Sequence, residues 1–285
     1  ISNKDIQNTL KASKGMDYVV VVVGDNSMRY KWKDKTAGEN MARADLNLAG
    51  KQLDLVRSLK EINNNVIVVY VNGKPISEPW IQNNIPSIIE AWEPGNLGGK
   101  AVAEIIFGDI NPSGKLPLTV PRSVGQLQMI YNHKPSQYFH KYAFEKNTPL
   151  YSFGYGLSYT KFNYSKPKLL NTNFDTNSII KVQVDVTNTG DMDGDEVVQL
   201  YIRDKVSSVT RPVKELKGYK RVHIKVGETK NVIFEITPES LAFYDIDMNY
   251  VVEPGSFNIM TGSSSHFKSL KTIELTILNK IEFNN

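Results

Sequence analysis

The stretch Tyr18-Val-Val-Val-Val-Val23 contains an unbroken run of β-branched side chains. A run of this kind is typical of a strand that is buried on both faces of a parallel sheet. The stretch Val66-Ile-Val-Val-Tyr-Val71 has the same character. Between the two, residues 50–62 place apolar side chains at three-residue steps, which predicts an amphipathic helix.

The alternation of strand and helix continues along the first half of the chain. Ser87-Ile-Ile-Glu-Ala-Trp92 predicts a shorter third strand, and residues 100–107 predict another helix. Strands that alternate with helices favour a mainly parallel sheet. For residues 1–138 we therefore expect an open α/β sandwich domain, which is partial because it is expected to lack its first strand.

The pattern changes in the second half of the chain. Residues 179–186 alternate apolar and polar side chains, as in a strand with one buried face. Further short strands are expected at residues 197–202, 220–226, 231–236, 256–260 and 272–277. About seven short strands without a helical pattern are typical of an all-β sandwich. We therefore expect a fibronectin type III-like domain over residues 165–285.

Residues 139–164 join the two halves and are rich in aromatic side chains. These are Tyr142, Phe144, Tyr151, Phe153, Tyr155, Tyr159 and Phe162. Because a flexible linker would be polar, we expect this aromatic-rich junction to pack on both domains.

The composition fits two folded domains and excludes several classes of protein. The chain has 285 residues, of which 40% are hydrophobic and 22% are charged, so it can bury a sizeable core. A net charge of +4 without a basic block gives no argument for a nucleic-acid partner. The longest apolar run is far shorter than the roughly 20 residues that span a bilayer, so no membrane partner is expected. The absence of cysteine excludes disulfides and thiolate catalysis.

Dedicated motifs for metals, phosphates and serine nucleophiles are not matched. The four histidines are not spaced as the ligands of a metal ion would be. A calcium loop that starts at Asp191 would need glycine at position 196 and glutamate at position 202, but these positions hold Glu196 and Ile202. Residues 94–100 are glycine-rich but match no phosphate-binding loop. Residues 156–160 end in threonine, where a nucleophile elbow requires glycine. The sequence therefore implies no cofactor.

The polar loop at residues 24–45 is the strongest candidate for a site. It leaves the carboxyl end of a parallel strand, where open α/β sheets bind their ligands, and it is longer than a connection requires. Its acidic side chains are Asp25, Asp34, Glu39 and Asp45. A carboxyl group here would protonate a leaving oxygen if its pKa were raised, and the alternative is a solvated loop face.

Ordered motifs along nearly the whole chain resemble the C-terminal part of glycoside hydrolase family 3, near the bacterial β-glucosidases. They include Val21-Val-Val-Gly-Asp25, Gly38-Glu-Asn-Met-Ala-Arg43, Glu90-Ala-Trp-Glu-Pro-Gly95 and, as the most diagnostic, Phe153-Gly-Tyr-Gly-Leu-Ser-Tyr-Thr160. The resemblance implies a retaining, exo-acting β-glycosidase that hydrolyses terminal β-linked sugars. Family members consist of an N-terminal (β/α)8 barrel, an α/β sandwich and a fibronectin III-like domain.

The resemblance also implies site residues. In the family, an aspartate nucleophile lies on the barrel, and the general acid/base glutamate lies on a loop of the α/β sandwich. That glutamate stands four residues before an arginine and shortly before an Asp-Leu-x-Leu segment. Glu39, with Arg43 and Asp45-Leu-Asn-Leu48, fits this spacing. On the same loop, Trp32 and Arg29 are expected to contact the leaving-group side of the substrate, and loop packing is their alternative role.

The expected partners follow from the resemblance. They are a β-linked oligosaccharide or β-glucoside and the N-terminal barrel, which is absent from this sequence, so the chain alone is expected to be inactive. The first residue is Ile1 rather than an initiator Met, so we expect a processed protein or a fragment. The expected location is periplasmic or secreted. A homodimer, reached through residues 205–211, is left open.

Two other functions remain as alternatives. The chain would be a non-catalytic module if its two domains bind glycans or a partner protein, and calorimetry against oligosaccharides would test this. The hypothesis that the chain is a nucleotide-binding α/β protein rests only on Gly24 and the loop at residues 94–99.

Overall fold

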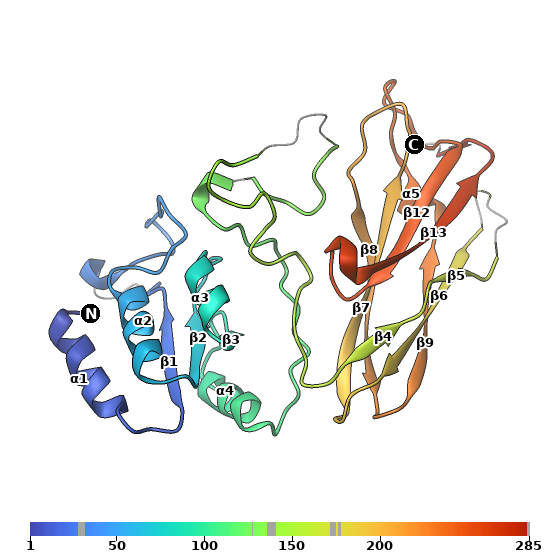
Figure 1. Ribbon diagram of the computed structural model, residues 1–285. Coiled ribbons are helices and arrows are strands. Elements are labelled where there is room, and N and C mark those ends of the chain that lie inside the picture. Colours follow the sequence, from blue (N-terminus) through green and yellow to red (C-terminus); the bar gives the residue numbers. More distant parts are fainter. Residues whose placement is uncertain (28–31, 127, 136–140, 172–174, 176–177, 284–285) are drawn as a thin grey trace. The chain divides into compact units, whose positions relative to one another are not determined.

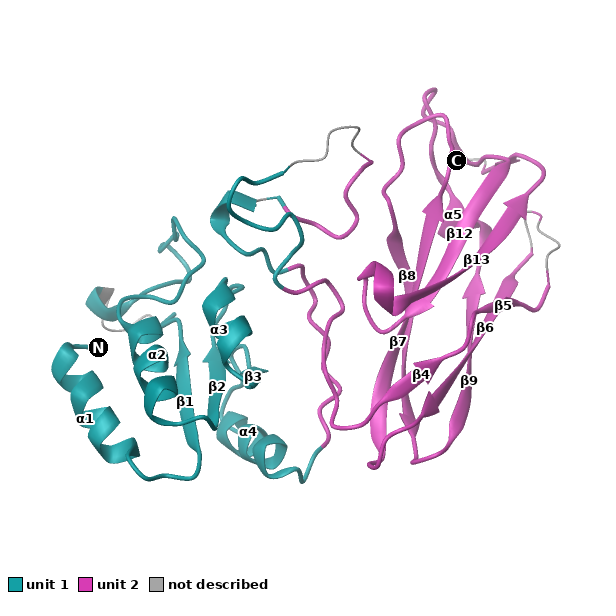
Figure 2. Ribbon diagram, in the orientation of Figure 1, with its two compact units in different colours: residues 1–110, 120–128, 141–150 teal, residues 111–119, 129–140, 151–285 magenta. Residues whose placement is uncertain are grey.

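The computed structural model of the chain describes residues 1–27, 32–126, 128–135, 141–171, 175 and 178–283. The chain divides into two compact units, which are coloured separately in Figure 2. Unit 1 comprises residues 1–110, 120–128 and 141–150, and unit 2 comprises residues 111–119, 129–140 and 151–285. The segments of the two units therefore alternate along the sequence between residues 110 and 151.

Unit 1 is an α/β layer around a three-stranded parallel sheet with the strand order β1-β2-β3 (Figure 1). Its strands are β1 (Val19–Gly24), β2 (Val66–Val71) and β3 (Ser87–Glu90). Its helices are α1 (Asn3–Ser13), α2 (Gln52–Ile62), α3 (Pro79–Asn84) and α4 (Gly98–Phe107), and two short 3₁₀ helices are η1 (Trp32–Asp34) and η2 (Val124–Gln126). The predicted parallel α/β sheet is confirmed.

Helix α2 covers one face of this sheet, as its apolar spacing predicts. Val56 and Leu59 are buried and pack in one cluster with Val19, Val21 and Val23 of β1. Helices α1 and α3 were not predicted. Helix α1 buries only one side chain, Ile6. Its start is nevertheless marked by a capping box, in which Ser2 and Asp5 bond each other's backbone N–H groups.

The prediction that the first strand is buried on both faces is wrong for β1. Val20 and Val22 are 46% and 62% exposed, whereas the alternate valines of the strand are buried. Strand β1 lies at the edge of the sheet, and the packing of α2 covers only one of its faces. Strand β2, in the middle of the sheet, has four buried residues out of six and fits the prediction better.

Unit 2 is an antiparallel β-sandwich. One sheet has the order β13-β12-β7-β8, and the facing sheet contains β4, β6 and β5, with β9 paired to β6. These strands are β4 (Phe162–Tyr164), β5 (Lys168–Leu169), β6 (Ile180–Asn188), β7 (Gly194–Asp204), β8 (Glu215–Ile224), β9 (Thr229–Ile236), β12 (Gly255–Gly262) and β13 (Leu270–Ile277). A small third sheet contains β10 (Phe243–Tyr244), β11 (Tyr250–Val252) and β14 (Ile281–Glu282), and two short helices are α5 (Pro238–Leu241) and η3 (Phe267–Ser269).

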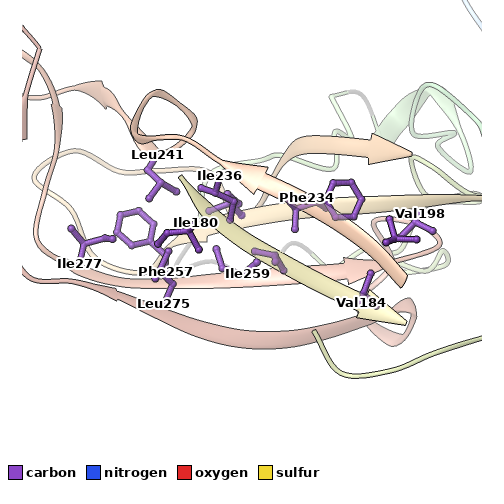
Figure 3. Packing of buried hydrophobic residues seen from close by; sticks show 14 of the residues in the cluster. Ile180, Val184, Val198, Phe234, Ile236, Leu241, Phe257, Ile259, Leu275 and Ile277 are labelled. Atoms are coloured by element: carbon purple, nitrogen blue, oxygen red, sulfur yellow. The ribbon is translucent and has the colours of Figure 1, made fainter. Parts of the chain in front are cut away.

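The core of the sandwich lies between its two main sheets (Figure 3). Ile180, Val182, Val184 and Val186 of β6 are all fully buried, which confirms the alternation read from the sequence. They pack with side chains such as Phe257, at 1% exposure, from the facing sheet. The predicted all-β sandwich is therefore confirmed.

The junction segment divides between the two units. Residues 141–150 group with unit 1, where Phe144 is fully exposed, and residues 151–164 group with unit 2. Within unit 2, the buried Gln199 side chain donates to the carbonyl oxygen of Gly154 at 3.1 Å, and Phe153 stacks on Tyr131 with ring centroids 4.2 Å apart. The domain limits at residues 138 and 164 stay a prediction.

Candidate functional site

Charged side chains follow the carboxyl ends of all three parallel strands of unit 1. Asp25 directly follows β1, Lys74 lies three residues after β2, and Glu93 lies three residues after β3. Because the carboxyl ends of parallel strands meet at one edge of the sheet, this is where an open α/β fold binds its ligands. A cavity of about 540 Å³ lies here. Its lining residues are Ser27, Lys35, Ala37, Gly38, Glu39, Met41, Arg43, Leu46, Gly73, Lys74 and Glu93.

Glu39 is presented to this cavity by a tight turn. The Met41 N–H donates to the carbonyl oxygen of Gly38 at 2.9 Å, which closes a four-residue turn. Gly38 has φ 99° and Asn40 has φ 58°, so residues in the left-handed region flank Glu39 on both sides. Glycine and asparagine are the residues that adopt this region most readily. The local sequence therefore places an exposed glutamate at the apex of a turn.

A buried lysine side chain stabilises the turn by a hydrogen bond to its backbone. Lys35 is only 6% exposed, and its ammonium group donates to the carbonyl oxygen of Glu39. Gly38 packs closely here, because a Cβ atom at that position would lie 3.2 Å from the Cβ of Ser27 and 3.5 Å from the Lys35 stem. The turn is therefore held both by its own backbone conformation and by a charged hydrogen bond.

The four acidic side chains of the loop have different environments. The Asp25 side chain is 1% exposed and lies 3.2 Å from the ammonium group of Lys74. Asp45 accepts a hydrogen bond from the Arg43 guanidinium, which lowers the pKa of that carboxyl. Asp34 and Glu39 are exposed, and of the four acids Glu39 is the one that lines the cavity. The structure thus separates Glu39 from the other three.

Arg43 links the segments on both sides of the turn. One guanidinium nitrogen donates to the carbonyl oxygen of Thr36 at 3.4 Å and lies 3.5 Å from the Asp25 carboxylate. The other donates to Asp45 and, at 3.0 Å, to the carbonyl oxygen of Asn47. Arg43, whose spacing of four residues pointed to Glu39 in the sequence, therefore has a direct structural role next to the turn.

Sequence reasoning missed a second carboxylate in the cavity, Glu93. The Ser27 hydroxyl donates to it at 2.6 Å, which ties the loop after β1 to the loop after β3. A Cβ atom on Gly73 would lie 3.3 Å from the same carboxylate. Glu93 follows the end of the third parallel strand, so the rule that singled out residues 24–45 would also have found it.

A half-buried acid, Glu90, precedes Glu93 by three residues in the sequence. Burial raises the pKa of Glu90 from 4.5 to about 7, although the Trp92 N–H donates to its carboxyl at 3.2 Å. Strand β3 ends at Glu90, and Trp92 adopts a left-handed conformation with φ 52°. This conformation is an outlier for an aromatic residue. The turn that leads to Glu93 therefore combines backbone strain with a carboxyl group that titrates near neutral pH.

The two other predicted site residues lie largely outside the described part of the chain. Arg29 is not among the described residues. The backbone of Trp32 begins η1, but its side chain is not described. Their contacts with the leaving-group side of a substrate stay predictions.

The described residues offer neither a metal centre nor a membrane-spanning helix. These residues contain no group of three or more histidine, aspartate or glutamate side chains that could hold a metal ion. No helix in the described ranges is both long enough and apolar enough to cross a membrane. The acidic stretch at residues 191–195 leads into β7, and Asp195 near the start of this strand pairs with Arg221 and His223 of β8.

Two protein families match the chain. The Glycosyl hydrolase family 3 C-terminal domain matches residues 2–159, and the Fibronectin type III-like domain matches residues 196–265. The first match covers the loop that carries Glu39, and the second covers most of the sandwich.

Curated relatives match the chain over almost its whole length. A β-xylosidase from Formosa agariphila is 46% identical over 279 residues, which is 97% of this chain and 38% of that protein. A periplasmic β-glucosidase from Salmonella typhimurium is 39% identical over 270 residues, which is 91% of this chain and 34% of that protein. The chain thus spans little more than a third of the length of these relatives.

Solved structures show the same fold. A β-glucosidase from Erythrobacter marinus superimposes with a TM-score of 0.88 at 39% identity, covering 96% of this chain and 36% of that one. A β-glucosidase from Listeria innocua in complex with glucose superimposes with a TM-score of 0.88 at 31% identity, covering 98% and 39%.

Proposed function

Because the chain belongs to glycosyl hydrolase family 3, we propose that it supplies the general acid/base of a retaining, exo-acting β-glycosidase. Glu39 is that acid/base. The nucleophile is an aspartate on a (β/α)8 barrel that precedes this chain in the longer protein. In support, the matched relatives are named as β-xylosidases and β-glucosidases, and they are nearly three times as long as the chain.

The proposed reaction has two steps that share one carboxyl group. In the first, the barrel aspartate attacks the anomeric carbon while Glu39 donates its proton to the departing glycosidic oxygen. In the second, Glu39 takes a proton from water, and that water releases the sugar from the aspartate. A retaining mechanism requires the two carboxyl groups to stand roughly 5 Å apart. Glu39 must therefore be held where the barrel can meet it.

The observation that supports Glu39 most strongly is the contrast among the acids of its loop. Asp25 is buried between two cations and Asp45 is bonded to Arg43, so both carboxyl groups are engaged in contacts with cations of the chain. Glu39 instead lines a cavity at the carboxyl edge of the sheet, on a turn that Lys35 supports. A proton donor needs both access to its substrate and a fixed position, and Glu39 combines the two.

The substrate class follows from the relatives. We propose a terminal β-linked glucose or xylose at the non-reducing end of an oligosaccharide or simple glycoside, because relatives of both kinds match. No cofactor is required by two-carboxylate chemistry. A periplasmic or secreted location is proposed from the relative that is named periplasmic.

The direct test replaces Glu39 in the full-length protein that contains this chain. For Glu39→Ala we expect turnover of alkyl or unactivated aryl β-glycosides to fall by about 10²–10⁴-fold. Activated dinitrophenyl glycosides should lose much less in their first step, because their leaving oxygen needs no proton. Added azide should restore part of the second step and yield a glycosyl azide.

Glu93→Gln is the matched control, because Glu93 lines the same cavity as Glu39 and its substitution also removes one negative charge. It should show neither the leaving-group dependence nor the azide effect. If Glu39→Ala affects good and poor leaving groups equally, and azide changes nothing, Glu39 is not the acid/base. The chain without its barrel should hydrolyse neither kind of substrate.

A further inference from the structure

We propose that Asp25 is a positioning residue that holds both flanks of the turn that presents Glu39. This inference rests on the proposed function of Glu39. The Asp25 carboxylate lies at the carboxyl end of β1 and contacts Thr36, three residues before Glu39, and Arg43, four residues after it. In the sequence, Asp25 is one of four acids of the loop and ends the motif Val21-Val-Val-Gly-Asp25, and neither feature assigns it a role.

The contacts join the two flanks at one carboxylate. The Thr36 hydroxyl donates to one Asp25 oxygen at 3.4 Å, and the Arg43 guanidinium lies 3.5 Å from the same oxygen. The Thr36 hydroxyl also accepts the Asn26 N–H at 2.8 Å, and the Thr36 N–H donates to the Asn26 carbonyl at 2.9 Å. The first flank is thereby bonded to the chain directly after Asp25.

The second flank is held through charge. Arg43 and Lys74 both approach the buried carboxylate, and Lys74 comes from the loop after β2. A buried carboxylate is tolerated only when it is paired, and the loss of its charge would leave two partly buried cations facing each other. Asp25 therefore sets the separation between the loops that form two walls of the cavity.

Asp25 is itself fixed by the sheet. Its N–H donates to the Val71 carbonyl at 3.0 Å, which continues the pairing of β1 with β2 beyond the last paired residue, Gly24. Its side chain is 1% exposed and is not part of the cavity lining, so it has no access to a substrate. Asp25 can therefore affect the reaction only by fixing the position of the turn that carries Glu39, and in this sense it is a positioning residue.

The test is Asp25→Asn in the full-length protein, because asparagine keeps the shape and loses the charge. For a substrate with a poor leaving group we expect kcat to fall by roughly 10- to 100-fold, since a small misplacement of a catalytic group has effects of this size. KM should change by less than about threefold, since no substrate contact is lost. A dinitrophenyl glycoside should lose less than about threefold in its first step.

Asp34→Asn is the matched control, because Asp34 is an exposed acid of the same loop. It should stay within about twofold of the parent for every substrate. Hydrogen exchange of the Thr36 and Met41 amides should become faster in Asp25→Asn and stay unchanged in Asp34→Asn. If Asp25→Asn does not fold, Thr36→Val removes one of the same contacts without a change of charge and should show the same dependence on the leaving group.

The outcomes separate the two proposals. If Glu39→Ala shows the dependence on the leaving group, but Asp25→Asn and Thr36→Val slow all substrates equally or behave as Asp34→Asn does, the positioning role is wrong and the role of Glu39 stands. If Glu39→Ala lacks the dependence, the proposed function fails first. A change in KM without a change in kcat would also overturn the positioning role.

Discussion

Strand β1 of unit 1 and strand β6 of unit 2 are both rich in valine, but their side chains are buried differently. In β6 the apolar side chains alternate with polar ones, and each apolar position is fully buried. In β1 every position is apolar, and yet Val20 and Val22 are 46% and 62% exposed. An alternating pattern specifies which face of a strand is buried. An unbroken apolar run specifies only that either face can be buried, and whether each face is buried depends on the elements that pack against it.

Two acids with restricted exposure, the buried Glu196 and the half-buried Glu90, show a second difference between the units. In unit 2 the buried Glu196 lies 3.1 Å from the Lys115 ammonium group and accepts the Tyr164 hydroxyl at 2.7 Å. In unit 1, burial raises the pKa of Glu90 to about 7, and its carboxyl accepts hydrogen bonds from neutral groups of Trp92 and Asn72. The sandwich thus pairs its acid with a cation, while the end of β3 in unit 1 carries an acid whose pKa is raised to about 7 and whose printed hydrogen bonds come from neutral groups.

The largest effect is expected in the core of the sandwich. Phe257→Ala removes a ring that is 1% exposed, and we expect a loss of about 3–5 kcal/mol in the free energy of unfolding. Phe267→Ala is the control, since that ring is 69% exposed, and it should cost less than about 0.5 kcal/mol. Urea unfolding of the two variants measures the difference. Equal losses would show that the core in Figure 3 does not stabilise the sandwich.

An intermediate effect is expected from pH. The folded-state pKa of Glu90, about 7, lies above its ordinary value of 4.5, so the folded protein retains a proton that the unfolded chain releases. Stability from this group is therefore highest below about pH 4.5 and falls as pH rises to about 7, by roughly 2 kcal/mol after allowance for partial exposure. Glu90→Gln should remove this part of the pH dependence. Hydrogen exchange of the Trp92 amide at several pH values measures it, and an unchanged profile in the variant would contradict the assignment.

The third prediction compares the two strands directly and includes the smallest expected effect, at Val22. Val→Thr keeps the shape of the side chain and adds a hydroxyl group. At Val184 of β6, which is fully buried, we expect a loss of about 1–3 kcal/mol. At Val22 of β1, which is 62% exposed, the change should stay within about 0.5 kcal/mol. If Val22→Thr costs as much as Val184→Thr in the full-length protein, an element outside this chain covers that face of β1.

The fold was predictable where a pattern is local. The alternation of β6 identified its buried face, and the spacing of apolar residues in α2 identified the helix. Helix α1 was missed because its stability depends on capping at Ser2 more than on an apolar stripe. Helix α3 was missed because it has only six residues and begins at Pro79, which sets its first turn.

The candidate site was predictable only in part. The position of the loop after β1 follows from the rule on parallel strands, but the four acids of the loop look equivalent in the sequence. Resemblance to a family pointed to Glu39, and the contacts of Asp25 and Asp45 then distinguished it. The contacts of Asp25 could not be predicted, because this buried carboxylate joins residues that are distant from it in the sequence. Glu93 required the end of β3 to be located first.

The alternation of the two units along the chain has a consequence for how this region can be recombined. Between residues 110 and 151 the backbone passes from one unit to the other five times. No single crossover point in the sequence could exchange an intact sandwich between homologues while leaving the α/β unit whole. Chimaeras joined anywhere inside this interval should therefore combine, within at least one unit, segments from two different parents.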